Sequence, residues 1–577
     1  MSGNVFEVGN EFGNGSLRYL DGVGVIGQEL IIGVQNPGLV EVDGFLARVA
    51  GPTGFGDPLV ALGNAQLEIK NGGEFAAFDI TDQSSANSFT NSVITVDGSG
   101  STLTTQMLEL GISPLRLSQL TISNGARLDS GNAFLGGQSS SSGVVIAEVT
   151  GVGSVLTVQS PLVVGARSSL TIRNGGTVAT NFTAVQGSLT LDGGLLLANG
   201  SGGAPQLSLD GTLRGDGLVG QELQMDLNAR LSVGPGQTLT FNAPFALHDL
   251  SGVTTVDAGT LEFIQGDASL FPSGSIVASN ATLAADQWFL GGPLSVVGGG
   301  TTEVFGRIQT SPVQDGGAVR VAENSTVRFF ANFVNNDEVD VRPGSTATFL
   351  DVVQGNGSFV GGGDFVFLGT LAPGNSPAEV SFQGDVTLGT SSTLDIELAG
   401  LTNGSFDRLD VSGDAAIAGS LVVTAIDGFQ PLPGDSFEII AADAVAGTFD
   451  AVTNAFGLVG LGLDVDYFTD AVVLEPTRLL DGDANFDGVV DLADFGLLRA
   501  GFGDSGRNAA DFNLDGTVDL ADFGILRAFF GQSLGGDLGA RAGDLAMMDA
   551  WAATVPEPAS VALLVPAGLT LLRRRRS

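Results

Sequence analysis

Short runs of alternating apolar and polar residues recur along the chain, and many of them end at a glycine-containing turn. A phrase of the form Leu-x-Ile-x-Asn-Gly occurs at residues 67–72, 120–125 and 170–175, at offsets of 53 and 50 residues. Alternation with period two is typical of strands that bury one face, and Asn-Gly tolerates the positive φ angles of a sharp turn. The pattern therefore predicts a repeated unit that holds several short strands.

A second phrase, Gly-x-Gly-Ser-x-Leu, tracks the first: it occurs at residues 98–103 and again 53 residues later, at 151–156. Strands of this kind bury their apolar face only by stacking on neighbouring strands. We therefore predict a mainly β chain, folded as a right-handed parallel β-helix or similar β-solenoid, with a series of β-sandwiches as the alternative. Solenoid repeats are expected over residues 1–300, and a continuation with a capping β domain over 301–476.

The composition favours many short strands over long helices. The chain has 87 Gly, 7% aromatic and 15% charged residues, and a mean hydropathy of +0.30, which is too apolar for a disordered chain. The net charge of −40, with Lys70 as the single lysine, argues against a nucleic-acid partner, because clustered basic residues are needed to neutralise phosphates. Cations are the natural counterpart. The absence of Cys excludes disulfides and thiolate metal sites.

Two acidic stretches, residues 483–494 and 511–522, match each other position by position at an offset of 28 residues. Each has oxygen-bearing side chains at positions 1, 3, 5, 9 and 12 and a glycine at position 6, the spacing of a loop that wraps calcium. Position 7 would add a backbone carbonyl. We predict two calcium ions, whose binding is coupled to folding because the carboxylates repel one another without a cation. The predicted ligands are Asp483, Asn485, Asp487, Val489, Asp491 and Asp494 in the first loop, and Asp511, Asn513, Asp515, Thr517, Asp519 and Asp522 in the second.

Each loop runs into apolar residues at helical spacing. These are Phe495, Leu498 and Phe502 after the first loop, and Phe523, Leu526 and Phe530 after the second. Paired calcium loops that each precede one helix resemble the type I dockerin domain over about residues 480–532, and we place this module at 477–535. Solvated acidic turns are the alternative interpretation.

The dockerin resemblance implies a cohesin-like protein partner. Dockerins often carry a hydroxyl pair at loop positions 10 and 11, but this chain has Leu492-Ala493 and Leu520-Ala521 there. The departure puts cohesin binding in doubt. A different protein partner, or packing of this apolar pair against the solenoid, stays open.

The carboxyl-terminal residues follow a glycine-rich linker expected at 536–555. Residues 556–577 hold Pro-Glu-Pro, an apolar run too short to span a bilayer, and an arginine cluster. This order resembles the PEP-CTERM sorting signal, which implies processing by an exosortase-type enzyme with transient membrane contact; a random apolar tail is the alternative. The signal residues are Pro556, Glu557, Pro558, Arg573, Arg574, Arg575 and Arg576. Residues 1–15 lack a basic start followed by an apolar run, so we expect the natural start to lie upstream.

Residues 40–470 resemble the β-solenoid repeats of autotransporter passenger regions, chiefly in the segments 371–377, 386–389 and 394–398. In those families the solenoid serves as a stalk, adhesin or display scaffold. The resemblance implies a secreted or cell-surface protein, with extracellular polysaccharide as a candidate ligand.

No catalytic residue stands out. His248 is the single histidine, so a Ser-His-Asp triad has no other base and a histidine metal cluster is excluded. The alternative function is a dockerin-bearing polysaccharide-degrading enzyme, either a glycoside hydrolase or a lyase, because two carboxylates suffice for glycoside hydrolysis. Trp288 and Trp551 are the only tryptophans that could stack on sugar rings. We therefore expect an exported structural or adhesive protein rather than an enzyme.

Overall fold

In the computed structural model the described residues lie between Val5 and Val555. Before residue 59 they comprise only the strands β1 (Val5–Val8), β2 (Gly15–Tyr19), β3 (Val23–Ile26), β4 (Glu29–Ile32), β5 (Gly38–Asp43) and β6 (Leu46–Val49). From residue 59 onward the structure describes the chain to residue 555 except for 63–64, 83–90, 113–115, 137–142, 201–203, 244–245, 265, 271–273, 311–317 and 375–376. The predicted sorting signal at 556–577 lies outside the described residues.

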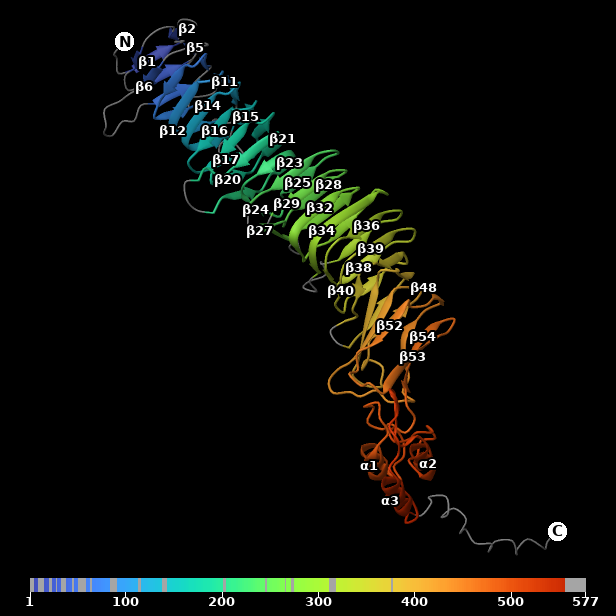
Figure 1. Ribbon diagram of the computed structural model, residues 1–577. Helices are drawn as coiled ribbons and strands as arrows, with labels where there is room; N and C mark the ends of the chain where they lie inside the picture. Colours follow the sequence, from blue (N-terminus) through green and yellow to red (C-terminus); the bar gives the residue numbers. More distant parts are fainter. Residues whose placement is uncertain are drawn as a thin grey trace, which may run out of the picture. The chain divides into compact units, whose positions relative to one another are not determined.

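Parallel strands stacked in successive turns form a β-solenoid of about 14 turns (Figure 1). This confirms the mainly β solenoid, while its right-handed path stays a prediction. The alternative of serial β-sandwiches is wrong, because sandwiches are built from antiparallel sheets. The chain divides into two compact units, residues 1–352 with 357–364, and residues 353–356 with 365–577.

One stack of strands in the first unit explains the repeat in the sequence. It consists of β8 (Ala65–Lys70), β11 (Asn91–Asp97), β13 (Leu117–Ser123), β15 (Val144–Thr150) and β18 (Ser169–Arg173), paired in parallel in that order. Their register places Leu67, Ile94, Leu120, Ala147 and Leu170 in one buried column. Each repeat of 53 or 50 residues therefore spans two turns of the solenoid, not one.

The two phrases form two kinds of turn that alternate along this stack. Asn71 and Gly72 after β8 have φ angles of 52° and 79°, as predicted for Asn-Gly. The next turn carries Ser101, whose Oγ accepts a hydrogen bond of 3.1 Å from Gly72 N. Ser154 Oγ accepts the same bond from Gly125 N one repeat later, at 3.0 Å. Because each serine binds the Asn-Gly turn before it, two consecutive turns form one repeating unit.

The interior of the first unit changes from aliphatic to aromatic along the chain. Phe329, Phe333, Phe349 and Phe359 are all at most 2% exposed. The ring of Phe349 stacks on Phe329 at 5.1 Å and meets Phe333 edge-on at 5.2 Å. Offset and edge-to-face ring pairs contribute more than their buried area alone.

The second unit continues the parallel pairing and then reverses it. β47 (Arg408–Val411) pairs in parallel with β44 (Glu379–Phe382), and β49 (Ser420–Ala425) with β46 (Thr393–Leu398). These strands are thus further parallel turns within residues 301–476, where we expected a continuation of the solenoid and a capping β domain. Antiparallel pairing begins where β50 (Phe437–Ala441) meets β54 (Ala471–Arg478), which also pairs with β53 (Leu461–Tyr467). We call residues 461–478 the cap hairpin.

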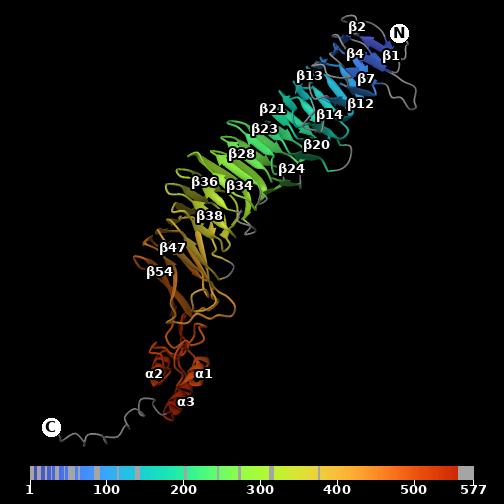
Figure 2. The same cartoon turned by 180° about the vertical axis from the view of Figure 1, so that it is seen from behind.

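Three helices follow the cap hairpin within the described residues: α1 (Leu492–Gly501), α2 (Leu520–Phe529) and α3 (Ala542–Ala552). Figures 1 and 2 show the three gathered together, and we call residues 480–555 the helical module. The third helix lies in the segment expected to be a linker. No helix among the described residues is long and apolar enough to cross a membrane.

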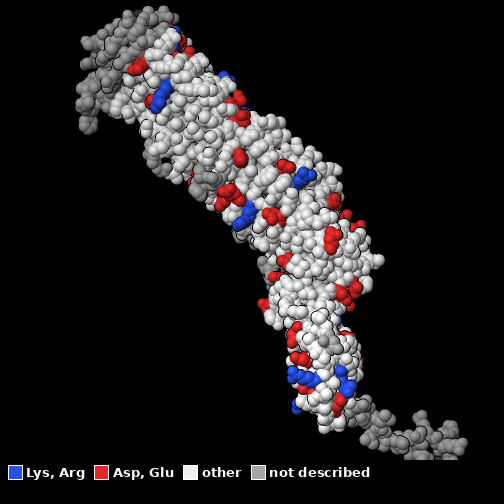
Figure 3. Space-filling model, viewed as in Figure 1, with Lys and Arg blue, Asp and Glu red and all other residues white. Residues whose placement is uncertain are grey.

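Acidic side chains are spread over the face of the molecule drawn in Figure 3. Some of them pair with arginines on neighbouring turns: Arg408 lies 3.1 Å from Glu379 and 2.7 Å from Glu438. Exposed pairs of this kind contribute about 1 kcal/mol or less each. The excess of negative charge is therefore only partly balanced within the chain.

Candidate metal centre

The two acidic stretches, which we call loop 1 (residues 483–494) and loop 2 (residues 511–522), each end in the first turn of a helix. Asp491 is the N-cap of α1, and Asp494 completes a capping box with it. Asp519 and Asp522 do the same for α2. These contacts satisfy backbone N–H groups that have no partner inside the helix. The predicted ligand positions 9 and 12 therefore also begin the helices.

Position 12 of each loop ties the loop to its helix. Asp494 Oδ1 accepts from Ala484 N at 2.8 Å and from Asn485 N at 3.2 Å, while its Oδ2 accepts from Asp491 N at 2.8 Å. The side chain is fully buried, and the equivalent Asp522 has the same three kinds of partner. The structure thus places both residues at the junction of loop and helix, and their role as calcium ligands stays a prediction.

Position 1 of each loop leaves one carboxylate oxygen without a partner. Asp483 Oδ2 accepts from Gly488 N at 2.8 Å, and Asp511 Oδ2 accepts from Gly516 N at 2.9 Å. Asp483 is 0% exposed and Asp511 is 5% exposed, yet Oδ1 of each is buried with no hydrogen-bond partner among the described residues. A buried carboxylate oxygen without a donor is costly, so both loops fit a cation at this point.

Position 6 bends as expected. Gly488 and Gly516 have φ angles of 84° and 88°, which L side chains rarely adopt. Each glycine N–H points back to the first aspartate of its loop, so the bend and the position of that aspartate depend on each other.

The remaining acidic side chains of each loop face backbone donors. Asp487 accepts from Val489 N at 2.9 Å, and Asp491 accepts from Ala493 N at 2.7 Å; their counterparts in loop 2 do the same. Across the described part of the chain, no three His, Cys, Asp or Glu side chains are grouped so that they could hold a metal ion. A cation would have to draw the carboxylates together against their mutual repulsion.

Burial disfavours the charged form of these carboxylates. It raises the pKa of Asp494 to about 6, against several backbone hydrogen bonds that lower it, and it also raises the pKa of Asp483 and of Asp522. A divalent cation beside such groups would favour their ionised form and bring the pKa down. The pKa values of Asp483 and Asp494 stay raised even though the positive charge of Arg478 interacts with both carboxyls.

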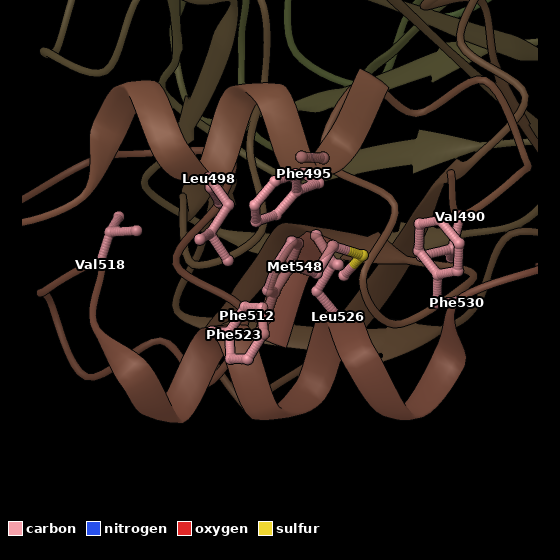
Figure 4. Packing of buried hydrophobic residues seen from close by; sticks show 11 residues of the cluster. Val490, Phe495, Leu498, Phe512, Val518, Phe523, Leu526, Phe530 and Met548 are labelled. Carbon is pink, nitrogen blue, oxygen red and sulfur yellow. The ribbon is translucent and has the colours of Figure 1, made fainter. Parts of the chain in front are cut away.

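The predicted apolar stripes of α1 and α2 pack into one core, shown in Figure 4. Phe495 and Leu498 from α1 meet Phe523 and Leu526 from α2 in this core. This part of the prediction is confirmed. Because each loop leads directly into one side of this core, the packing fixes both loops relative to each other.

The helix that the sequence analysis missed completes this core. Met548 of α3 is fully buried, and the Trp551 ring meets Phe495, Phe502 and Phe523 at centroid distances of 5.3, 5.2 and 5.8 Å. The signal was present in the sequence, since these apolar positions are three residues apart. A glycine at 543 and a short length made the segment look like a linker.

Arg478, the last residue of β54, also escaped the sequence analysis. Its guanidinium donates to the Asp483 carbonyl and, at 2.7 Å, to the Ala509 carbonyl. It lies over the rings of Phe486 and Phe512, 5.1 and 4.6 Å from their centroids. Burial lowers the pKa of Arg478 to about 10, and the neighbouring aspartates oppose this shift. The side chain therefore stays charged at neutral pH.

His248 has the environment of a core residue. It is fully buried, its Nδ1 accepts from Leu223 N at 3.1 Å, and its ring packs between Phe241 and Phe263 at 5.5 and 4.6 Å. Burial lowers its pKa to about 4. A neutral, enclosed imidazole cannot serve as a base for a substrate.

The His248 environment predicts a pH dependence of stability. The unfolded chain binds a proton near pH 6.5 and the folded chain only near 4, so the stability is present above 6.5 and is lost as the pH falls through this window. We expect a loss of roughly 3 kcal/mol in the free energy of unfolding. His248→Asn keeps an acceptor for Leu223 N but does not titrate, so its unfolding curves should lack this step. An equal slope in both proteins would contradict the assignment.

Among the described residues outside the loops, Asp407 is the carboxyl whose pKa is strongly raised, and its side chain is buried like that of His248. Burial raises its pKa to about 7, while hydrogen bonds from Ala378 N at 2.7 Å and Glu397 N at 2.8 Å oppose the shift. With 1% exposure it connects strands and does not reach a substrate.

Each loop offers carboxylate and amide oxygens together with the carbonyl of Val489 or Thr517, which are the ligand types that calcium prefers. The contacts of loop 1 recur in loop 2 at equivalent positions.

Neither a scan against protein-family models nor a search of curated proteins found a match for this chain.

Proposed function

We propose that this chain is an exported structural or adhesive surface protein, in which the β-solenoid acts as a scaffold and the helical module binds two calcium ions. The observation that carries the proposal is the buried, unpartnered Oδ1 of Asp483 and its exact counterpart on Asp511. One orphaned carboxylate oxygen could be an accident of packing. The same atom at the same loop position, twice, indicates a missing partner of positive charge.

Calcium would be held by the loop residues at positions 1, 3, 5, 7, 9 and 12. The bound ion would supply positive charge that compensates the buried carboxylates and would thereby order the loops. The chain's own residues supply the rest of the design. Gly488 and Gly516 bend the loops, and the capping boxes at Asp491 and Asp519 fix where each helix begins.

The paired loops and helices support a dockerin-like interaction module. The apolar pair at loop positions 10 and 11 favours a partner other than a standard cohesin, since Leu492 is 40% exposed and no hydroxyl pair is present. The solenoid would offer its long stack of turns as a binding surface for extracellular polysaccharide or for another surface. The residues at 556–577 support delivery to the cell surface by an exosortase-type enzyme.

The non-enzymatic half of the proposal rests on the enclosure of His248 and Asp407. Both groups have shifted pKa values, which often marks a catalytic site, but both are buried where no substrate reaches them. Release of oligosaccharides from bacterial exopolysaccharides by the purified chain would contradict it.

Calorimetric titration of the full chain with calcium tests the proposal. We expect two ions per chain, with Asp487→Ala and Asp515→Ala each removing one site while leaving the other. Asp504→Ala is the matched control, because this exposed aspartate lies between the two loops and outside both. Unchanged heats in the Asp487→Ala and Asp515→Ala variants, or no heat in the unaltered chain, would refute the calcium assignment.

A further inference from the structure

The two loops have the same backbone but different surroundings at position 4. Phe486 in loop 1 and Leu514 in loop 2 both adopt a positive φ, 58° and 56°. Phe486 is 0% exposed, whereas Leu514 is 53% exposed. The side chain at position 4 is thus fully buried in loop 1 alone. We infer that loop 1 packs against residues that have no equivalent at loop 2.

The partner of loop 1 is the end of the solenoid. Phe486 forms a buried cluster with Leu432 and Leu461, against which Phe456 and Leu458 also pack. Leu461 is the first residue of the cap hairpin. Burying a phenylalanine side chain in such a cluster stabilises the contact. Loop 1 is therefore inserted into the cap and is not merely tethered to it.

Backbone hydrogen bonds also join loop 1 to the residues that flank the cap hairpin. Gly460 N donates to the Phe486 carbonyl at 2.8 Å, and the Gly460 carbonyl accepts from Leu479 N at 3.0 Å. A Cβ atom at Gly460 would collide with Asp483 Oδ2 and lie 2.9 Å from Phe486 Cα. The close approach thus requires glycine, and it places the cap directly against the first predicted calcium ligand.

Loop 2 meets the cap hairpin at Phe512, whose ring centroid lies 4.6 Å from the Arg478 guanidinium, but it leaves Leu514 exposed. A cleft of about 290 Å³ lies beside Phe512 and Leu514, and Pro433, Gly434 and Arg478 line its other side. At the equivalent position of loop 1 the Phe486 side chain is fully buried. The two calcium loops are therefore equivalent in sequence but not in their attachment.

Two arginines connect the segments around both loops with the solenoid end. Arg478 of the cap donates to the Asp483 carbonyl at the start of loop 1 and to the Ala509 carbonyl just before loop 2. Arg507, between the loops, binds Asp435 with Nε at 2.8 Å from Oδ1 and Nη2 at 2.8 Å from Oδ2. Forked arginine–carboxylate pairs of this geometry resist rotation.

We propose that occupation of loop 1 by calcium is coupled to the packing of the cap hairpin at residues 461–478, whereas loop 2 binds its ion independently of the cap. Calcium that orders Asp483 would also hold the Phe486 side chain against Leu432 and Leu461. It would likewise keep the Asp483 carbonyl hydrogen-bonded to Arg478. This inference rests on the proposed calcium binding. It assigns the two sites different roles: loop 1 joins the module to the solenoid end, and loop 2 serves the module alone.

Hydrogen exchange of the full chain, followed by mass spectrometry with and without calcium, tests the coupling. Phe486→Asn and Leu514→Asn form a matched pair, because asparagine tolerates positive φ and each change removes one apolar side chain at the same loop position. We expect calcium to slow exchange over residues 461–478 by about tenfold, within the usual range of coupling between sites. Leu514→Asn should keep this effect, and Phe486→Asn should lose it while exchange over loop 2 still responds to calcium.

The outcomes separate this inference from the calcium assignment. Two bound ions, with slower exchange confined to residues 483–522 in all three proteins, would overturn the coupling and leave the proposed function intact. No response to calcium anywhere would overturn both. Exchange over α1 and α2 reports whether the Phe486→Asn module is folded, and Phe486→Leu, which keeps an apolar side chain, should restore the calcium effect on the cap.

Discussion

Removal of calcium with a chelator is expected to destabilise the helical module by about 4 kcal/mol per site, if the free ion had been a thousandfold above its dissociation constant. The physical reason is the buried carboxylates: Asp483 and Asp511 each keep one oxygen without a hydrogen-bond partner among the described residues, and burial raises the pKa of Asp483, Asp494 and Asp522. Hydrogen exchange over α1 and α2 measures the effect directly, because these helices carry the core that the loops position.

A variant with both Asp483→Asn and Asp511→Asn provides the control for this experiment. It keeps an acceptor for Gly488 N and Gly516 N but removes the charge on the unpartnered oxygens. Its exchange should be the same with calcium and with chelator. A chelator effect of equal size in the double variant would mean that the loops are not the calcium sites.

Phe349→Ala is expected to lower the free energy of unfolding of the first unit by about 3–5 kcal/mol. Phe349 is 1% exposed and lies within 6.1 Å of the rings of Phe329, Phe333 and Phe359, so its loss leaves a cavity inside the aromatic stack. Thermal unfolding, monitored by hydrogen exchange of the adjacent turns, measures this loss of stability, because a solenoid loses structure locally around a weakened repeat.

Phe305→Ala is the matched control for this change. Phe305 also stacks on a phenylalanine, Phe330, at 4.4 Å, but it is 37% exposed. We expect a cost of about 1 kcal/mol, because an exposed ring pair buries little surface and leaves no cavity. Equal losses in the two variants would contradict the assignment of the aromatic stack as the core of these turns.

The β-solenoid could be predicted because its signals are local. Strand alternation and the Asn-Gly turns at 71–72, 124–125 and 174–175 each depend on a few neighbouring residues. The two-turn repeat could not be predicted in the same way. It depends on Ser101 and Ser154 reaching across to the preceding turn, which is a contact between residues 29 apart in sequence.

The loops were predictable for the same reason, and their setting was not. Twelve consecutive residues define each loop, and the structure shows the expected glycine bend. The helix-capping role of Asp491 and Asp519 was not predicted, and their role as calcium ligands stays a prediction. Phe486 and Arg478 contact residues that are distant in the sequence: Phe486 packs against Leu432, and Arg478 donates to the Ala509 carbonyl. Nothing in the local pattern distinguishes Phe486 from Leu514, although one is buried and the other exposed.

Native mass spectrometry of the full chain, which counts the calcium ions each molecule retains, tests whether the two loops are calcium sites. We expect two ions for the unaltered chain, one for Asp483→Asn, one for Asp511→Asn and none for the double variant. A chain that retains no calcium at millimolar free ion, or variants that retain as many ions as the unaltered chain, would contradict it.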